Sequence, residues 1–143
     1  MKLSENQNYM DYAKARAFGN LDESERFLQA CIAEAHGPSY ERAFLLTRMG
    51  SLKFEQGQRD ESLKWYEEAE AVDAASLLPV LFYAEFLAHR FGDVDASLKK
   101  CDRILDETNA YPFEATDEEL GSEYYERKAL EIREFCLSKG AKT

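Results

Sequence analysis

The pattern Gly-x-x-Asp-x-Ser occurs three times in the chain, beginning at Gly19, Gly57 and Gly92. Consecutive glycines of this pattern are 38 and 35 residues apart, a period typical of helical solenoid proteins. In such proteins one supersecondary unit is repeated, and each copy buries its apolar face against its neighbours. This repeat constrains the fold more than any bulk property of the chain.

Apolar residues return at helical spacing on both sides of each glycine, so the glycine falls between two amphipathic segments. A left-handed backbone conformation costs little only for glycine, and short turns between helices use it. We expect the aspartates of the pattern, Asp22, Asp60 and Asp95, to cap the second helix of each unit. Glu25 would complete a capping box with Asp22. The sequence therefore predicts three helical hairpins.

The middle unit follows a spacing of large, large-small, turn, small, aromatic and small residues, carried by Leu46, Met49, Gly50, Gly57, Ser62, Tyr66 and Ala69. This spacing resembles the tetratricopeptide repeat. Two positions depart from the family pattern: Lys53 stands where the family usually has Tyr, and Ala74 where it usually has Pro.

The other two units resemble the family less closely. The third unit matches it at Leu81, Ala84, Glu85, Ala88, Gly92, Ser97, Cys101 and Ile104. Glu85 takes a position that is normally small, so looser packing is expected there. The first unit has Asn8 and Asp11 at two usually apolar positions, and fits well only at Ser24, Leu28 and Cys31. A degenerate terminal unit is typical of a capping repeat, whose outer side meets water.

The resemblance implies an all-α fold, a right-handed superhelical solenoid of three hairpins. The length of 143 residues predicts a single domain over residues 1–143. The predicted repeats span residues 5–38, 41–75 and 77–107. Acidic residues after Pro112 and a following apolar stripe predict a further helix over residues 116–138. We expect it to cap the last hairpin, with two alternatives: it covers part of a groove, or it pairs with a second copy of the chain.

In a tetratricopeptide solenoid, the first helix of each hairpin lines a concave face, and the resemblance thus implies where a partner binds. The predicted partner-binding residues are Tyr9, Arg16, Phe44, Thr47, Phe54, Phe82, Phe86, His89 and Arg90. Clustered aromatic residues on a surface usually mark a binding site; alternatively, some of them pack against the C-terminal helix. The Lys and Asn clamp that some family members use to bind chaperone tails is absent, because its positions carry Tyr9, Ala13, Arg48, Pro79 and Tyr83.

The formal net charge of -10 argues against a nucleic-acid ligand, since phosphate binding depends on Lys and Arg. A second predicted surface is acidic and comprises Glu114, Asp117, Glu118, Glu119 and Glu123. Such a surface attracts basic proteins over long range, although acidity also simply maintains solubility. The sequence predicts a module that binds a protein or peptide. The alternatives are an acidic inhibitor or immunity protein that neutralises a basic toxin, and a small secretion chaperone of the same family.

No catalytic or metal-binding pattern is present in the sequence, and we expect no enzyme activity, cofactor or metal. Cys31, Cys101 and Cys136 lack metal-ligand spacing and are predicted to be buried. The three serines of the pattern are expected to be small residues at helix contacts, with hydroxyls bonded to their own helix. The N-terminus has no signal-peptide pattern and no segment could span a membrane, so a cytoplasmic protein is predicted. A homo-oligomer is not predicted.

Overall fold

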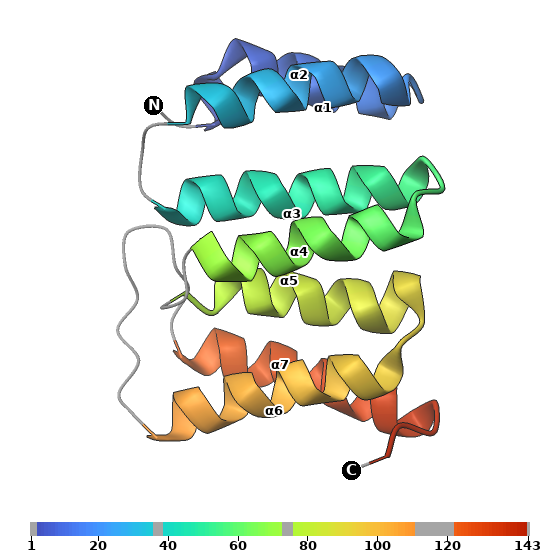
Figure 1. Ribbon diagram of the computed structural model, residues 1–143. Coiled ribbons are helices and arrows are strands. Elements are labelled where there is room, and N and C mark those ends of the chain that lie inside the picture. Colours follow the sequence, from blue (N-terminus) through green and yellow to red (C-terminus); the bar gives the residue numbers. More distant parts are fainter. Residues whose placement is uncertain (1–2, 36–38, 73–75, 111–121, 143) are drawn as a thin grey trace. The chain divides into compact units, whose positions relative to one another are not determined.

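The computed structural model describes residues 3–35, 39–72, 76–110 and 122–142. This part of the chain contains seven α-helices and no strand (Figure 1), which confirms the all-α prediction. The helices are α1 (Gln7–Ala17), α2 (Leu21–Glu34), α3 (Ser39–Glu55), α4 (Arg59–Val72), α5 (Leu78–Phe86), α6 (Val94–Ala110) and α7 (Ser122–Ser138). A 3-10 helix, η1 (Leu3–Glu5), precedes α1, and a π-helix, η2 (Leu87–Phe91), continues α5. Each helix described is too short or too polar to cross a membrane.

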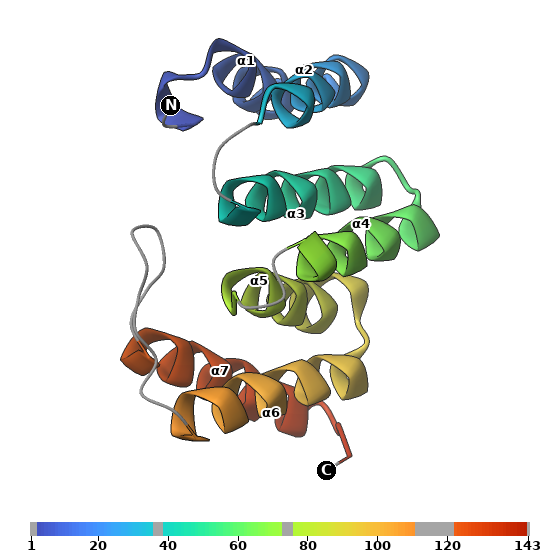
Figure 2. The same ribbon diagram turned by 60° about the vertical axis from the view of Figure 1, so that its left-hand side comes forward.

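The chain divides into two compact units, Met1–Asp73 and Ala74–Thr143. In the first unit, α1 packs against α2, α2 against α3, and α3 against α4. In the second unit, α5 packs against α6, and α7 lies against both of them. The two views show that the helices of each pair α1/α2, α3/α4 and α5/α6 lie side by side (Figures 1 and 2).

A glycine in the left-handed conformation joins the helices of each pair. The φ angles of Gly19, Gly57 and Gly92 are 79°, 83° and 94°, which confirms the prediction from the repeat. After Gly19 and Gly57, the next amide donates back across the turn, from Asn20 N to Ala15 O and from Gln58 N to Lys53 O, at 2.9 Å in both cases. These bonds satisfy carbonyls at the end of the first helix. In every pair the second helix begins two residues after the glycine.

The predicted aspartate caps are wrong. Because the second helix begins so soon after the glycine, Asp22, Asp60 and Asp95 lie inside its first turn. The cap of α2 is Asn20, whose side chain accepts a hydrogen bond from Glu23 N at 3.2 Å. At the start of α6, Asp93 Oδ1 accepts from Ala96 N at 3.0 Å. The motif aspartates still carry negative charge where the helix dipole favours it.

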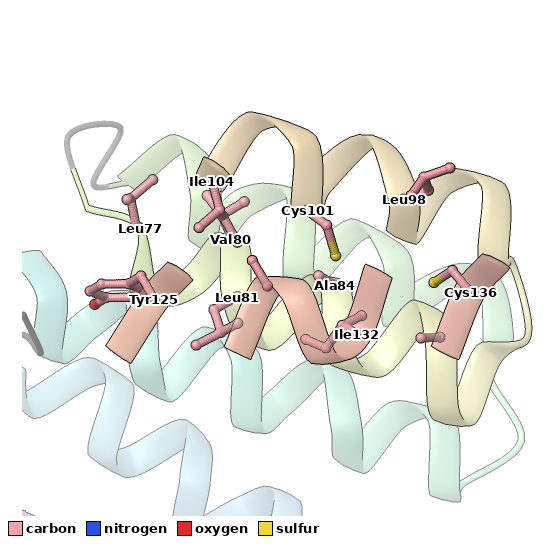
Figure 3. Close-up of a cluster of buried hydrophobic side chains, with 12 residues drawn as sticks. Leu77, Val80, Leu81, Ala84, Leu98, Cys101, Ile104, Tyr125, Ile132 and Cys136 are labelled. Carbon is pink, nitrogen blue, oxygen red and sulfur yellow. The ribbon is translucent and has the colours of Figure 1, made fainter. Parts of the chain in front are cut away.

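Each unit has its own buried apolar cluster. In the first unit it comprises Tyr12, Leu28, Cys31, Leu45, Met49 and Leu52. In the second unit it comprises Leu77, Val80, Leu81, Ala84, Ala88, Leu98, Cys101, Ile104, Tyr125, Ala129, Ile132 and Cys136 (Figure 3). Four of these residues belong to α7, so the apolar stripe of α7 is buried against α5 and α6. The three cysteines are free and buried, as predicted.

The three serines of the pattern are fully buried, but the prediction that each bonds to its own helix is wrong for two of them. Ser24 Oγ donates to Tyr12 O at 3.1 Å, and Ser97 Oγ donates to Ala84 O at 2.7 Å. Both acceptors belong to the preceding helix, whose carbonyl oxygens have a second lone pair for such a bond. Ser62 alone of the three donates within its own helix, to Arg59 O at 2.5 Å.

Candidate binding surface

Aromatic side chains of α1 and α3 meet within the first unit. The ring of Tyr9 lies 5.5 Å from that of Tyr12 and 6.3 Å from that of Phe44, measured between centroids. Tyr9 and Phe44 are half-buried and pack at the edge of the apolar cluster. The guanidinium of Arg48 lies 5.1 Å from the centroid of the Phe44 ring, at a distance where a cation is attracted to an aromatic face. The structure thus brings together two predicted residues, Tyr9 and Phe44, on neighbouring helices.

Arg16 links α1 to α3 through several hydrogen bonds. Its guanidinium donates to Tyr12 Oη at 2.6 Å and to Ser51 Oγ at 2.7 Å, and it forms an ion pair with Glu55. The Arg16 side chain is only 19% exposed. Burial disfavours the charge, but the hydrogen bond to Glu55 and the nearby Tyr12 outweigh burial, so that the pKa of Arg16 is raised. This predicted site residue is therefore a fixed cation at the junction of two helices.

Burial also affects the pKa of Tyr9. It raises the pKa of the Tyr9 phenol, and Tyr12 adds to this effect, whereas the nearby Arg48 and Arg16 partly oppose it. The phenol therefore remains protonated at neutral pH, and its hydroxyl is able to donate a hydrogen bond. We define the α1/α3 surface as Tyr9, Arg16, Phe44 and Arg48, with the hydroxyl of the buried Tyr12 held by Arg16 beneath it. It combines aromatic rings, hydroxyls and guanidinium groups, which suits recognition of a ligand.

The other predicted residues of the first unit are placed differently. Thr47 is fully buried, and its Oγ1 donates to Phe44 O at 2.6 Å. Its side chain therefore belongs to the packed interior of α3. Phe54 is half-buried near the end of α3, where the Arg59 guanidinium lies 5.4 Å from its ring centroid.

The predicted residues of the second unit lie on α5 and η2. Phe82 is half-buried, while Phe86 is 3% exposed and its ring lies 5.9 Å from that of Phe91. His89 and Arg90 are exposed on the π-helix. The His89 ring lies 4.3 Å from that of Phe135 on α7. His89 therefore contacts the C-terminal helix.

Four residues of the predicted acidic surface, Glu114, Asp117, Glu118 and Glu119, lie outside the described residues. The fifth, Glu123, is exposed in the first turn of α7. Among the residues that the structure describes, no group of three or more His, Cys, Asp or Glu is placed to hold a metal ion.

The sequence did not predict that Tyr12 and Arg48 contact the predicted residues Arg16 and Phe44. Tyr12 stands four residues before Arg16, a spacing that places both on one side of a helix, and this spacing was the available signal. In the tetratricopeptide pattern, Arg48 stands at a clamp position. In the structure, its guanidinium lies near the rings of Phe44 and Tyr9.

No protein-family model, curated protein or solved structure matches the chain. The resemblance to tetratricopeptide repeats therefore stays a prediction from the residues of this chain.

Proposed function

We propose that the protein is a non-catalytic interaction module of the tetratricopeptide type. In this proposal, the three hairpins stack into a right-handed superhelical solenoid that α7 closes. A peptide or a segment of another protein binds along the first helices of the hairpins. The observation that carries the proposal is the α1/α3 surface, where aromatic rings and arginines from two first helices lie together.

The repeated turn geometry supports the solenoid. Gly19, Gly57 and Gly92 share a left-handed conformation, and each second helix begins at the same offset from its glycine. Hairpins built to one plan can stack in a regular way, and stacked hairpins curve into an extended binding surface.

The composition of the α1/α3 surface supports a protein ligand. Tyr and Arg are enriched among the residues that carry most of the binding energy at protein interfaces. The Tyr9 and Phe44 rings are already held by packing, so these two side chains would lose little conformational entropy when a partner binds. Such a surface fits a segment that offers an apolar or aromatic side chain to the rings.

An acidic inhibitor of a basic protein is the second candidate. Exposed carboxylates on α4 and α7 favour it, at Glu61, Glu67, Glu68, Glu123, Glu126 and Glu134, together with the net charge of -10. Binding of that kind is weakened strongly by salt. Anchoring on aromatic rings depends less on salt. A secretion chaperone of the same family would rely on the rings in a similar way.

The experiment is selection of a random-peptide display library on the purified protein, followed by affinity measurements on the enriched peptides. The variants Tyr9→Leu and Phe44→Leu remove the rings but keep apolar volume. The matched control is Phe18→Leu, which removes an aromatic ring that is 79% exposed elsewhere on the first unit. We expect each surface variant to bind about tenfold more weakly and the control to bind like the wild type. Equal affinities for all three variants, or no enriched peptide, would contradict the proposal.

A salt series on the same peptides distinguishes the second candidate. If the enriched peptides are basic and their affinity falls steeply with salt in every variant alike, exposed carboxylates, and not the rings of the α1/α3 surface, bind the peptides.

A further inference from the structure

Helix α7 ends in the same way as α1. Gly140 has a φ of 90°, Gly140 N donates to Leu137 O at 3.1 Å, and Ala141 N donates to Cys136 O at 3.0 Å. At the end of α1, Gly19 N donates to Arg16 O and Asn20 N donates to Ala15 O in the same pattern. The two helices can therefore be aligned on these glycines.

This alignment places Leu130 at the position of Tyr9 and Leu137 at the position of Arg16. On α1, both positions contact α3: the Tyr9 ring lies 6.3 Å from the ring of Phe44, and Arg16 donates to Ser51 at 2.7 Å. On α7, Leu130 is 47% exposed and Leu137 is 36% exposed. The side of the helix that receives a neighbouring helix on α1 is thus exposed on α7.

The exposed side of α7 has a definite composition. Helical periodicity places five exposed residues along it, which we call the outer face of α7: Glu123, Glu126, Leu130, Glu134 and Leu137. The structure describes four exposed large hydrophobic residues, and two of them are on this face. The other side of α7 is already buried against α6, beside which it lies in both views (Figures 1 and 2). The two leucines are one heptad apart on the unpacked side of α7, a spacing at which another helix can contact both.

The charges on the outer face indicate the chemistry of its partner. Three carboxylates, Glu123, Glu126 and Glu134, flank the two leucines. Arg127 stands at the edge of the face, with its guanidinium 5.5 Å from the centroid of the Tyr124 ring. A second copy of the chain would bring the same three glutamates and a net charge of -10, so that charge repulsion opposes self-pairing. A partner with Lys and Arg around an apolar stripe is complementary.

We infer that the outer face of α7 docks a basic amphipathic helix of another protein. That helix places two apolar side chains, one heptad apart, against Leu130 and Leu137, and basic side chains near Glu126 and Glu134. Amphipathic helices bind apolar surfaces through anchors at such spacings. This surface lies in the second unit and does not include any residue of the α1/α3 surface, so the inference does not depend on peptide binding there. It rests on the same α7 carboxylates as the second candidate of the proposed function, and it adds an apolar contact at Leu130 and Leu137 and a helical partner.

The first test uses a fluorescent synthetic peptide that repeats Leu-Lys-Lys-Leu-Leu-Lys-Lys, with a scrambled peptide of the same composition for comparison. The test variant is the double substitution Leu130→Gln and Leu137→Gln. The matched control, Met10→Gln with Phe18→Gln, removes the other two exposed hydrophobic residues. We expect the test variant to bind the amphipathic peptide about tenfold more weakly than the wild type, and the control to bind it equally well.

A second pair of variants tests the charge complementarity. Glu126→Gln with Glu134→Gln alters the outer face, while Glu67→Gln with Glu68→Gln changes the net charge equally on α4, where both residues are exposed. The α7 pair should lower the affinity, and its salt dependence, more than the α4 pair.

Three outcomes would overturn the inference. The first is that the amphipathic peptide does not bind better than the scrambled one. In the second, the variants of the outer face of α7 and their controls lose affinity equally, which would show that the peptide does not bind this face specifically. The third is a wild-type dimer in sedimentation experiments that the Leu130→Gln and Leu137→Gln substitutions dissociate, since a second copy would then be the occupant. Circular dichroism of each variant verifies the fold, which exposed substitutions should leave intact.

Discussion

Gly50 of α3 lies directly against the ring of Tyr66 of α4. A Cβ atom on Gly50 would be 2.6 Å from Cδ2 and 2.7 Å from Cε2 of that ring. The ring is itself buried, with 3% of Tyr66 exposed. The two helices can therefore approach this closely only because Gly50 has no side chain. In the third repeat, the positions that correspond to Gly50 and Tyr66 hold Glu85 and Cys101. The larger residue at the first position is thus accompanied by a smaller residue at the second.

Substitution of Gly50 by Ala is expected to destabilise the protein. Overpacking in a buried contact typically costs about 1–3 kcal/mol, whereas the higher helix propensity of Ala returns about 1 kcal/mol. The net loss should appear as a lower midpoint in urea denaturation.

The double variant Gly50→Ala with Tyr66→Leu separates the two effects. Once the ring is gone, the alanine should no longer be unfavourable, and its helix propensity should make it neutral or stabilising relative to Tyr66→Leu alone. If Gly50→Ala costs as much without the ring as with it, the contact does not explain the cost.

The buried serines Ser97 and Ser62 should contribute differently to the free energy of unfolding. Ser97→Ala removes the hydrogen bond from α6 to Ala84 O of the preceding helix, and we expect a loss of about 1 kcal/mol in the free energy of unfolding. Ser62→Ala removes only a bond within its own helix, and alanine is the better helix former, so this variant should be nearly neutral. Thermal denaturation of both variants checks the difference, and a larger loss for Ser62→Ala would contradict it.

The ion pair between Lys53 of α3 and Glu25 of α2 should make stability depend on pH. Their side chains are 13% and 23% exposed, and Lys53 Nζ lies 2.8 Å from Glu25 Oε1. The hydrogen bond from Lys53 lowers the pKa of Glu25 below its ordinary value of 4.5, against the opposing effect of burial. Because the folded-state pKa is depressed, this stabilisation is present above about pH 4.5 and is lost as the pH falls through the lower folded-state pKa.

Lys53→Met should therefore reduce stability by about 1 kcal/mol at neutral pH and by less in acid. The control is Lys64→Met, since Lys64 lies 3.8 Å from Glu61 in an exposed pair. Melting temperatures of both variants across the acid range test the prediction. An equal, pH-independent effect of the two substitutions would exclude it.

The cysteines should be unreactive in the folded protein. Burial raises the pKa of the Cys31 thiol to about 11 and that of Cys101 to about 12, and Cys136 is fully buried. Because the thiolate is the reactive species, a thiol reagent at neutral pH should label none of the three until denaturant is added. Rapid labelling of the native protein would show that these helices open readily.

The local part of the fold could be predicted from the sequence, because its causes are local. Apolar periodicity and the conformation of Gly57, for example, depend only on neighbouring residues. The sequence alone does not distinguish Asp22 from Asn20 as the cap of α2, because both are polar residues that can cap a helix and the length of the turn is not apparent from the sequence.

Contacts between distant residues could not be predicted in the same way. Arg16 is close to Ser51 and Glu55 only because α1 and α3 are neighbours, and Ser24 reaches Tyr12 O only because α2 packs on α1. Thr47 was expected on a binding face, yet helical spacing alone does not fix the rotation of α3 well enough to show that this residue points inward.

The left-handed glycines also affect how a mutational scan of this protein should be interpreted. Gly19, Gly57 and Gly92 are exposed, and a Cβ at any of them would meet no neighbouring atom within 4 Å. Side chains there would nevertheless be disfavoured, because the chirality of L-amino acids opposes a positive φ. In saturation mutagenesis, these sites would combine surface exposure with intolerance, a signature usually assigned to ligand recognition. Here that signature would reflect only the handedness of the turns.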